Sequence, residues 1–158
     1  MPVINYNYAN GDKKLSTHFR LSEFKCANYI TVLLDSDLVD MLEKLYSKLN
    51  CSKMIITSGY RDPNYSVSVG GSRTDQHTKG KAADIICWDM LGKVIDTKYI
   101  SCIAQDLGFN GIARIPNNAI HLDVRTGSKY YGDETKGTNT VTSNFYEYYG
   151  IKKGYDVM

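Results

Sequence analysis

The chain has 158 residues, 42% of them hydrophobic and 23% charged, and its formal net charge at pH 7 is +2. This length suits one domain with a real hydrophobic core, and the composition is ordinary for a globular protein. The small net charge, spread without a dense basic patch, gives no reason to expect a nucleic-acid partner. No apolar run approaches the roughly 20 residues of a membrane helix, so we expect no membrane partner. We also expect a monomer.

The amino-terminal half begins with a segment that we predict to be an irregular arm, residues 1–14 (MPVINYNYANGDKK). It lacks the apolar stretch of a secretory signal peptide, so we expect a protein made in the cytoplasm. The protein would leave the cytoplasm only by a route that its own sequence does not encode. Residues 21–24 are expected to open a short helix. The clearest helix is DSDLVDMLEKLYSKLN, residues 35–50, whose leucines recur at helical spacing between capping aspartates and Asn50.

A predicted strand, a loop and a second predicted strand follow. The first strand lies in KMIITSGY and ends at Gly59, and the second is the apolar run AADIICWD, residues 82–89. Residues 61–80 are polar and contain several glycines, which favours a long functional loop with little regular structure. Small residues at Gly80 and Ala82 would let this loop fold back close to the second strand.

The second half predicts one helix and a pair of strands. Residues 96–107 have helical spacing, and Gly108 is a typical helix end. GIARI, residues 111–115, and AIHLDVR, residues 119–125, are short strands joined by a hairpin-type connection. The order of these elements predicts an α+β fold, a small antiparallel sheet with flanking helices.

Residues 126–158 form a polar, aromatic-rich extension of the domain that we assign to residues 1–125. We expect this extension to pack on the same domain, although its tyrosines would also suit stacking on the sugar rings of a cell wall. The four cysteines are far apart and lack zinc-ribbon spacing, so we expect reduced thiols that fill apolar gaps.

The strand AIHLDVR has an unusual polar face. Alternation places His121, Asp123 and Arg125 on one side and apolar residues on the other. His77 lies in the preceding loop segment and Asp84 at the start of a strand that we expect to be a neighbour. Two neutral imidazoles and one carboxylate make a suitable zinc site with a fourth position for water, whose pKa falls to about 7. Spacing alone leaves open that these are ordinary surface or core residues.

Two stretches, DQHTKGKAADI and IHLDVR, together resemble the paired signature of the zinc D-Ala-D-Ala peptidases of the M15 family. That signature is Ser-x-His-x-x-Gly-x-Ala-x-Asp followed by a later histidine. Two upstream stretches, HFRLSEF and SGYRDPNYSVSVGG, also resemble segments of the family. The similarity runs from about Ser16 to Arg125 in the right order, which makes it specific.

The resemblance implies that His77, Asp84 and His121 bind one Zn²⁺ ion and that Arg61 faces the substrate. It also implies the compact α+β fold shared with the hedgehog signalling domain. A peptidase that acts at a chain end must recognise a carboxylate, which a guanidinium binds bidentately. Arg61 would alternatively stabilise the oxyanion, and an exposed arginine without a role remains the plainer interpretation.

The chain departs from the family pattern at three positions. Asp75 stands where the family has serine, and Ser66 stands where an asparagine is usual. More seriously, many relatives have an acidic general base three residues before the last histidine, where this chain has Asn118. Asp123 is the nearest alternative, as the base or as a partner that orients a zinc ligand. An ion pair between Asp123 and Arg61 or Arg125 is an equally good interpretation.

We therefore expect a zinc metallopeptidase that cleaves peptidoglycan stem peptides, as a D,D-carboxypeptidase or as an endopeptidase. A phage or prophage endolysin, or a virion-associated wall enzyme, fits the expected absence of a signal peptide. The alternative is a zinc-binding module of the same fold that has lost catalysis, which the asparagine at position 118 would favour.

Overall fold

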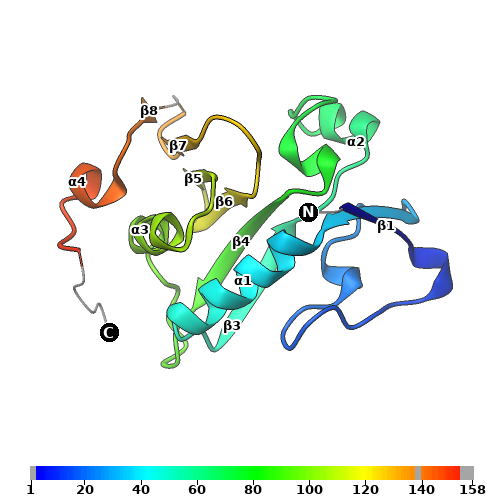
Figure 1. Ribbon diagram of the computed structural model, residues 1–158, viewed down its shortest axis with the longest axis horizontal. Coiled ribbons are helices and arrows are strands. Elements are labelled where there is room, and N and C mark those ends of the chain that lie inside the picture. Colours follow the sequence, from blue (N-terminus) through cyan, green and yellow to red (C-terminus); the bar gives the residue numbers. More distant parts are fainter. Residues whose placement is uncertain (1–2, 138–139, 154–158) are drawn as a thin grey trace.

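The computed structural model describes residues 3–137 and 140–153. A six-stranded sheet forms its centre, with strand order β3-β4-β6-β5-β7-β8 (Figure 1). These strands are β3 (Lys53–Ser58), β4 (Ala82–Trp88), β5 (Gly111–Ile115), β6 (Ala119–Asp123), β7 (Tyr130–Asp133) and β8 (Thr140–Val141). Neighbours pair antiparallel except β5 and β7, which are parallel. The expected α+β fold is confirmed.

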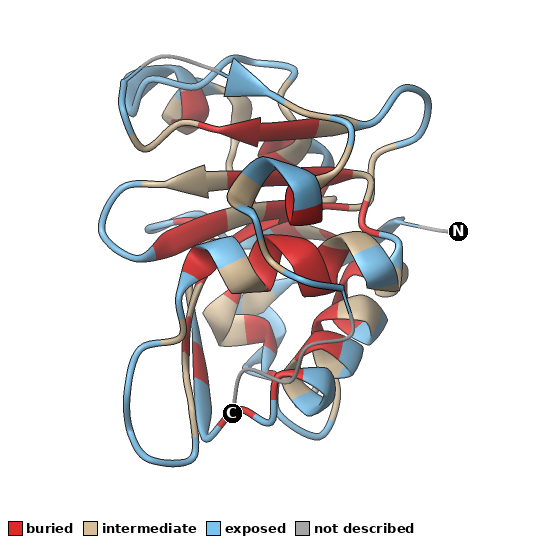
Figure 2. Ribbon diagram, turned by 90° about the vertical axis from the view of Figure 1, so that its left-hand side faces the viewer, coloured by how far each residue is buried: buried red, intermediate tan, exposed pale blue. Residues whose placement is uncertain are grey.

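The helices α1 (Ser36–Lys48) and α3 (Thr97–Leu107) contact each other and cover one face of the sheet. Helix α1 forms as its sequence predicts, because the Asp35 carboxylate caps it by accepting a hydrogen bond from the amide of Asp37. Its stripe of Leu38, Leu42 and Leu45 is fully buried. Figure 2 shows that buried residues gather where these helices face the sheet. Each such leucine contributes about 2 kcal/mol of hydrophobic stabilisation.

The opposite face of the sheet is polar at its centre. In β4 and β6, Ile85, Ile120 and Leu122 join the hydrophobic core, whereas the alternating residues Asp84 and His121 point the other way. Asp84 and His121 are partners in the β4–β6 register. The polar face predicted for β6 therefore lies beside the carboxylate of Asp84 on the neighbouring strand β4.

The amino-terminal segment differs from the prediction of an irregular arm. Strand β1 (Val3–Asn7) pairs antiparallel with β2 (Thr31–Asp35) in a separate two-stranded sheet. The short helices η1 (Tyr8–Asn10) and η2 (Leu21–Glu23) lie between these strands in the chain. The residues of β1 are mostly exposed, so their sequence lacks the apolar alternation that marks a buried strand. The prediction was wrong because pairing with a distant segment, and not local pattern, creates this strand.

The predicted loop at residues 61–80 contains more regular structure than expected. It includes the helix α2 (Pro63–Ser68) and the 3₁₀ turn η3 (Gln76–Lys79). Asp62 and Asp75 cap these two elements by accepting hydrogen bonds from the amides of Asn64 and Thr78. The Asp-Pro pair at the start of α2 is a helix-start signal that the prediction passed over.

The carboxy-terminal extension supplies β7, β8 and α4 (Phe145–Tyr149). Phe145 is fully buried in the hydrophobic core, and α4 contacts α3. Residues 138–139 and 154–158 of the predicted extension lie outside the described residues. All four cysteines are buried and unpaired. None of the helices in the described ranges has the length and apolarity that crossing a membrane requires.

Candidate metal centre

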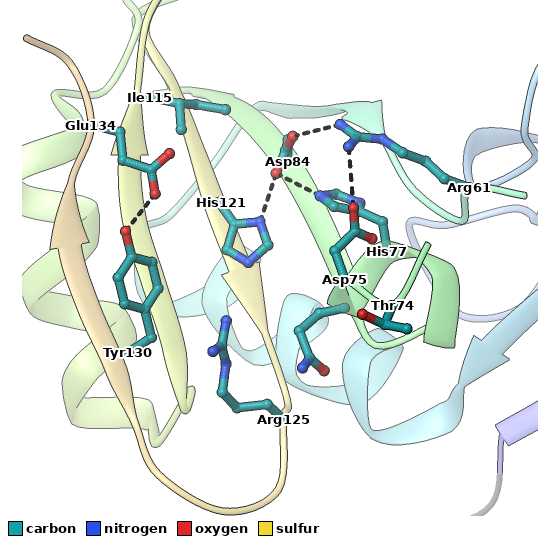
Figure 3. Close-up of a pocket in the computed structure, with 11 residues that line it drawn as sticks. Arg61, Thr74, Asp75, His77, Asp84, Ile115, His121, Arg125, Tyr130 and Glu134 are labelled. Carbon is teal, nitrogen blue, oxygen red and sulfur yellow. Dashed lines mark hydrogen bonds and ion pairs between the residues drawn. The ribbon is translucent and has the colours of Figure 1, made fainter. Parts of the chain in front are cut away.

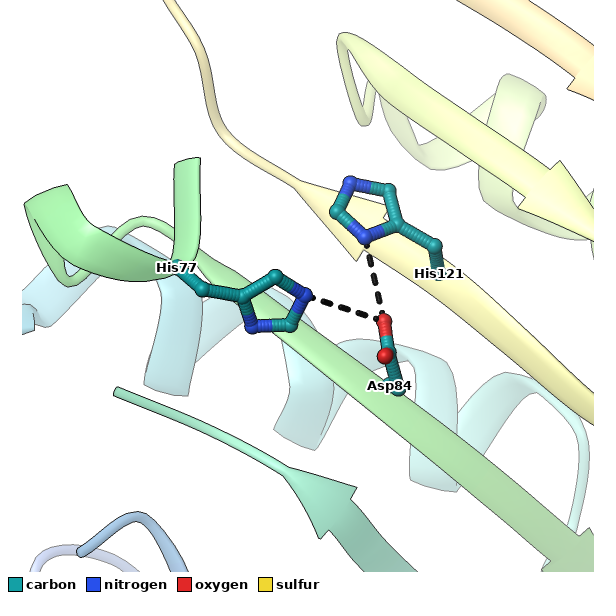
Figure 4. A group of neighbouring side chains, drawn as sticks. All are labelled: His77, Asp84 and His121. Atoms are coloured by element: carbon teal, nitrogen blue, oxygen red, sulfur yellow. Dashed lines mark hydrogen bonds and ion pairs between the residues drawn. The ribbon is translucent and has the colours of Figure 1, made fainter. Parts of the chain in front are cut away.

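Three donor side chains from separate elements meet on the polar face of the sheet (Figure 4). His77 comes from η3, Asp84 from β4 and His121 from β6. The Oδ1 atom of Asp84 lies 3.2 Å from Nε2 of His77 and 3.0 Å from Nδ1 of His121. The three ligand atoms lie within 4.8 Å of one another, and no second such group occurs in the part of the chain that the structure describes.

These donors fit a tetrahedral zinc ion. Ligand atoms about 2.0–2.1 Å from a tetrahedral centre lie roughly 3.3 Å apart, close to both spacings from Asp84. His77 and Asp84 are buried and His121 is partly buried, with 17% of its side chain exposed, which suits a site open on one side. Two imidazoles and one carboxylate also match the donor set of catalytic zinc sites.

Hydrogen bonds on the far side of each imidazole fix which nitrogen faces the donor group. His77 Nδ1 lies 2.8 Å from the carbonyl oxygen of Gly59, so this nitrogen carries the proton and donates it. His121 Nε2 lies 2.7 Å from Oδ2 of Asp123 and donates in the same way. The nitrogens that face Asp84 thus keep their lone pairs when the rings are neutral, as a metal ligand requires.

The charges around the cluster favour a cation at its centre. Burial would raise the pKa of Asp84, but its interactions with His121 and His77 hold that pKa well below its usual range. Burial would likewise lower the pKa of His121, but the bonds with Asp123 and Asp84 raise it to about 9. The raised pKa of His121 means that the carboxylates of Asp123 and Asp84 stabilise positive charge at this position, and the lowered pKa of Asp84 means that this carboxylate stays ionised.

Asp123 lies behind His121 and not in the pocket. It is 0% exposed, and Arg125 donates to it through Nε at 2.9 Å and Nη2 at 2.7 Å. The ion pair with Arg125 that the sequence allowed is therefore present, together with the contact to His121. Gly111 makes room for this carboxylate, because a Cβ atom at that position would lie 2.0 Å from Asp123 Oδ2.

Arg61 lies beside the cluster with its guanidinium between two carboxylates (Figure 3). Its Nη2 is 3.7 Å from Oδ2 of Asp84 and its Nη1 is 3.9 Å from Oδ2 of Asp75. Its Nε donates to Ser58 Oγ at 3.0 Å, which holds the side chain in place. Neither contact is a close bidentate ion pair, so both terminal nitrogens can still donate hydrogen bonds to a bound anion.

The backbone after His77 turns sharply, and this turn returns the chain to β4. Gly80 has φ +74°, and a Cβ atom there would lie 2.5 Å from the backbone carbonyl of Leu33. Only glycine satisfies both the left-handed conformation and the close approach to β2. The small residues around position 80 thus act by packing η3 against β2, which places His77 over Asp84.

The donor group lies in a pocket of about 480 Å³. Besides the predicted residues, two side chains from β7 and its end line this pocket, Tyr130 and Glu134 (Figure 3). Sequence reasoning missed both, because they lie in the extension beyond the resemblance. Parallel pairing of β7 with β5 brings them to the pocket, and short-range patterns do not reveal such pairing.

Asn118, at the position where relatives have an acid, lies in the β5–β6 turn. Both Asn117 and Asn118 have positive φ, 69° and 64°, a conformation that asparagine tolerates better than most residues. Asn118 is exposed and does not line the pocket. Asparagine suits this turn, which therefore supplies no acid at position 118. His18, the third histidine, pairs with Glu43 at 2.6 Å and takes no part in the cluster.

Comparison with protein-family models matches residues 17–123, well over half of the chain, to the model described as Peptidase M15. A search of curated proteins finds no match. The matched range begins before β2 and ends at Asp123, so it includes all three candidate ligands and Arg61. It leaves out the segment that supplies Tyr130 and Glu134.

Proposed function

The chain belongs to the peptidase M15 family, and from this premise we propose that it is a zinc-dependent peptidase of peptidoglycan stem peptides. One observation carries the proposal. His77, Asp84 and His121 converge with zinc-like spacing in an open pocket that also contains an arginine. The family establishes a peptidase, and the donor set supports zinc as its ion.

Zinc in this site would polarise the scissile carbonyl and lower the pKa of water to about 7. Residues of the chain would hold this ion in place. Asp84 supplies the one negative charge. The two imidazoles present lone pairs because their other nitrogens donate hydrogen bonds to the carbonyl of Gly59 and to the carboxylate of Asp123. The 480 Å³ pocket leaves space for a peptide on the side away from the sheet.

Arg61 is proposed to bind the carboxylate of the substrate or the oxyanion formed from its carbonyl. Substituting Arg61→Lys keeps the charge but removes the planar fork. We expect kcat/KM to fall by about 10- to 100-fold, the value of one or two charge-assisted hydrogen bonds, with bound zinc unchanged. Steady-state kinetics and metal analysis check this. A rate equal to that of the unmodified protein would leave Arg61 without a role in the reaction.

The substrate we propose is a stem peptide with a D-alanine end or cross-link, cleaved as by a D,D-carboxypeptidase or an endopeptidase. Such peptides lie in the cell wall, so we place the site of action there, as for a phage-type or virion-associated wall enzyme. The pocket supports a peptide with an anionic end, because Arg61 and Arg125 both line it.

The test combines metal analysis with mass spectrometry of muropeptides after digestion by the purified protein. We expect about one zinc per chain, the number that a single His-Asp-His site holds. We also expect cleavage that a chelator stops and added zinc restores, and lysis of wall suspensions to which the protein is added. Loss of a terminal D-alanine identifies a carboxypeptidase, and loss of cross-linked dimers identifies an endopeptidase.

The second candidate is a zinc-binding module of this fold without catalysis, and the turn asparagine at position 118 favours it. Stoichiometric zinc with every muropeptide intact would support that candidate and overturn the proposed peptidase. Cleavage that persists in the complete absence of metal would contradict both.

A further inference from the structure

The pocket contains a carboxylate that neither the family match nor the metal centre uses. Three acidic side chains line it in the described part of the chain, Asp75, Asp84 and Glu134. Asp84 belongs to the donor group. Asp75 is occupied as a cap, since its oxygens accept from Ser66 Oγ, the amide of Ser72 and the amide of Thr78. Glu134 remains as an acid that faces the site without a role.

The sheet register places Glu134 across the pocket from the donor group. One row of paired residues crosses the pocket face from β4 to β7: Asp84, His121, Ala113 and Gly132. Strands about 4.8 Å apart put Gly132 roughly 10 Å from His121, and Glu134 follows two residues later on the same face. Ala113, which lies between His121 and Gly132 in this row, has a small side chain, so no bulky group of β5 separates the two sides at this level.

Tyr130 and the backbone hold Glu134 in this position. The Tyr130 hydroxyl donates to Glu134 Oε2 at 2.5 Å, and the amide of Glu134 donates to the carbonyl of Arg114 at 2.8 Å. The Tyr130 ring reaches Glu134 by lying over Gly132, where a Cβ atom would be 2.7 Å from the tyrosine hydroxyl. Oε1 of Glu134 makes no hydrogen bond to any residue within 3–137 or 140–153, so it can accept a proton.

We propose that Glu134 is the general base of the reaction, supplied by the end of β7 in place of the acid missing from the β5–β6 turn. The inference rests on the proposed peptidase function. Asp123 is a poorer base, because it is fully buried and all of its hydrogen-bond partners hold it behind His121. Tyr130 is then a positioning residue, which aims the glutamate by its hydroxyl.

The proton transfers balance as follows. Glu134 takes one proton from water as the water oxygen bonds to the carbonyl carbon of the peptide. It gives that proton to the amide nitrogen as the C–N bond breaks. The second water proton passes from the new carboxyl group to the amine, which leaves a carboxylate, an ammonium group and ionised Glu134.

The experiment compares Glu134→Gln, Glu134→Asp and Tyr130→Phe, with Glu147→Gln as the control at an exposed glutamate of α4. We expect Glu134→Gln to lower kcat on muropeptides by about 10²- to 10⁴-fold, the range of general-base catalysis, with KM little changed. Zinc content and zinc affinity, measured by titration, should stay at the unmodified values. Glu134→Asp should recover part of the rate, and Tyr130→Phe should lose about 10- to 100-fold, as for one hydrogen bond to a charged group.

Three results would overturn the inference. Full activity in Glu134→Gln would show that Glu134 is not the general base, and it would not contradict the proposed peptidase function. Loss of zinc together with activity in that variant shows a structural role for the carboxylate. An unmodified protein that binds zinc but cleaves nothing removes the proposed function itself, and the base with it.

Discussion

Substituting Asp84→Asn is expected to remove most zinc binding and nearly all peptidase activity while leaving the fold intact. Asp84 provides the only negative charge among the three donors, and both imidazoles converge on its Oδ1 atom. Asparagine keeps the shape and one carbonyl acceptor but loses that charge. We expect zinc affinity to fall by more than about 100-fold, beyond the effect of changes outside the ligand set. The rate should fall by at least about 10³-fold, since the metal contributes several kcal/mol.

The measurements are zinc titration with a competing chelator, muropeptide hydrolysis and thermal unfolding of the metal-free proteins. Asp40→Asn, at an exposed position of α1, is the matched control and should behave as the unmodified chain. Unfolding temperatures within a few degrees of each other would show that Asp84 acts through the metal and not through the fold. Unchanged zinc affinity in Asp84→Asn would instead remove Asp84 from the ligand set.

The three donor residues, His77, Asp84 and His121, are the part of the site that is best predicted from local sequence patterns. His121 is placed by simple strand alternation, and Asp84 by the apolar run that its strand needs. The glycine after His77 signals a tight turn, although its reason, contact with the backbone of Leu33, appears only in three dimensions. The α1 and α3 helices and the β5–β6 hairpin were likewise predicted because their patterns are local.

The features that sequence reasoning missed depend on pairing between distant segments. Strand β1 exists because β2 lies next to it, about 30 residues later by the paired register. Glu134 reaches the pocket because β7 joins β5 in parallel, with Gly111 aligned to Tyr130. The contacts of Asp123 were only partly predictable. Alternation placed it on the face of His121, but Gly111 on the neighbouring strand is what allows its buried position.

A second large loss of zinc affinity is expected for Asp123→Asn. This variant distinguishes the two roles that the sequence left open for Asp123, the general base and the partner that orients a zinc ligand. Asparagine would present an amide N–H to His121 Nε2, where the carboxylate now accepts at 2.7 Å. The imidazole would then carry its proton on Nδ1, the nitrogen that faces Asp84, and lose its ligand lone pair. We expect zinc affinity to fall about 10- to 100-fold. Loss of the buried charge beside Arg125 should also destabilise the metal-free protein by about 3 kcal/mol.

Activity at high zinc concentration decides between positioning and general-base catalysis by Asp123. If this carboxylate orients His121, excess zinc refills the site and restores most of the rate in Asp123→Asn, because Glu134 still accepts the proton. If Asp123 is the base, the fully loaded variant stays slow by about 10²-fold or more. Zinc titration followed by hydrolysis at saturating metal separates these outcomes, with Asp40→Asn again as the control. Normal zinc affinity combined with a slow, saturated variant would return the base to Asp123 and leave Glu134 as a partner of Tyr130 alone.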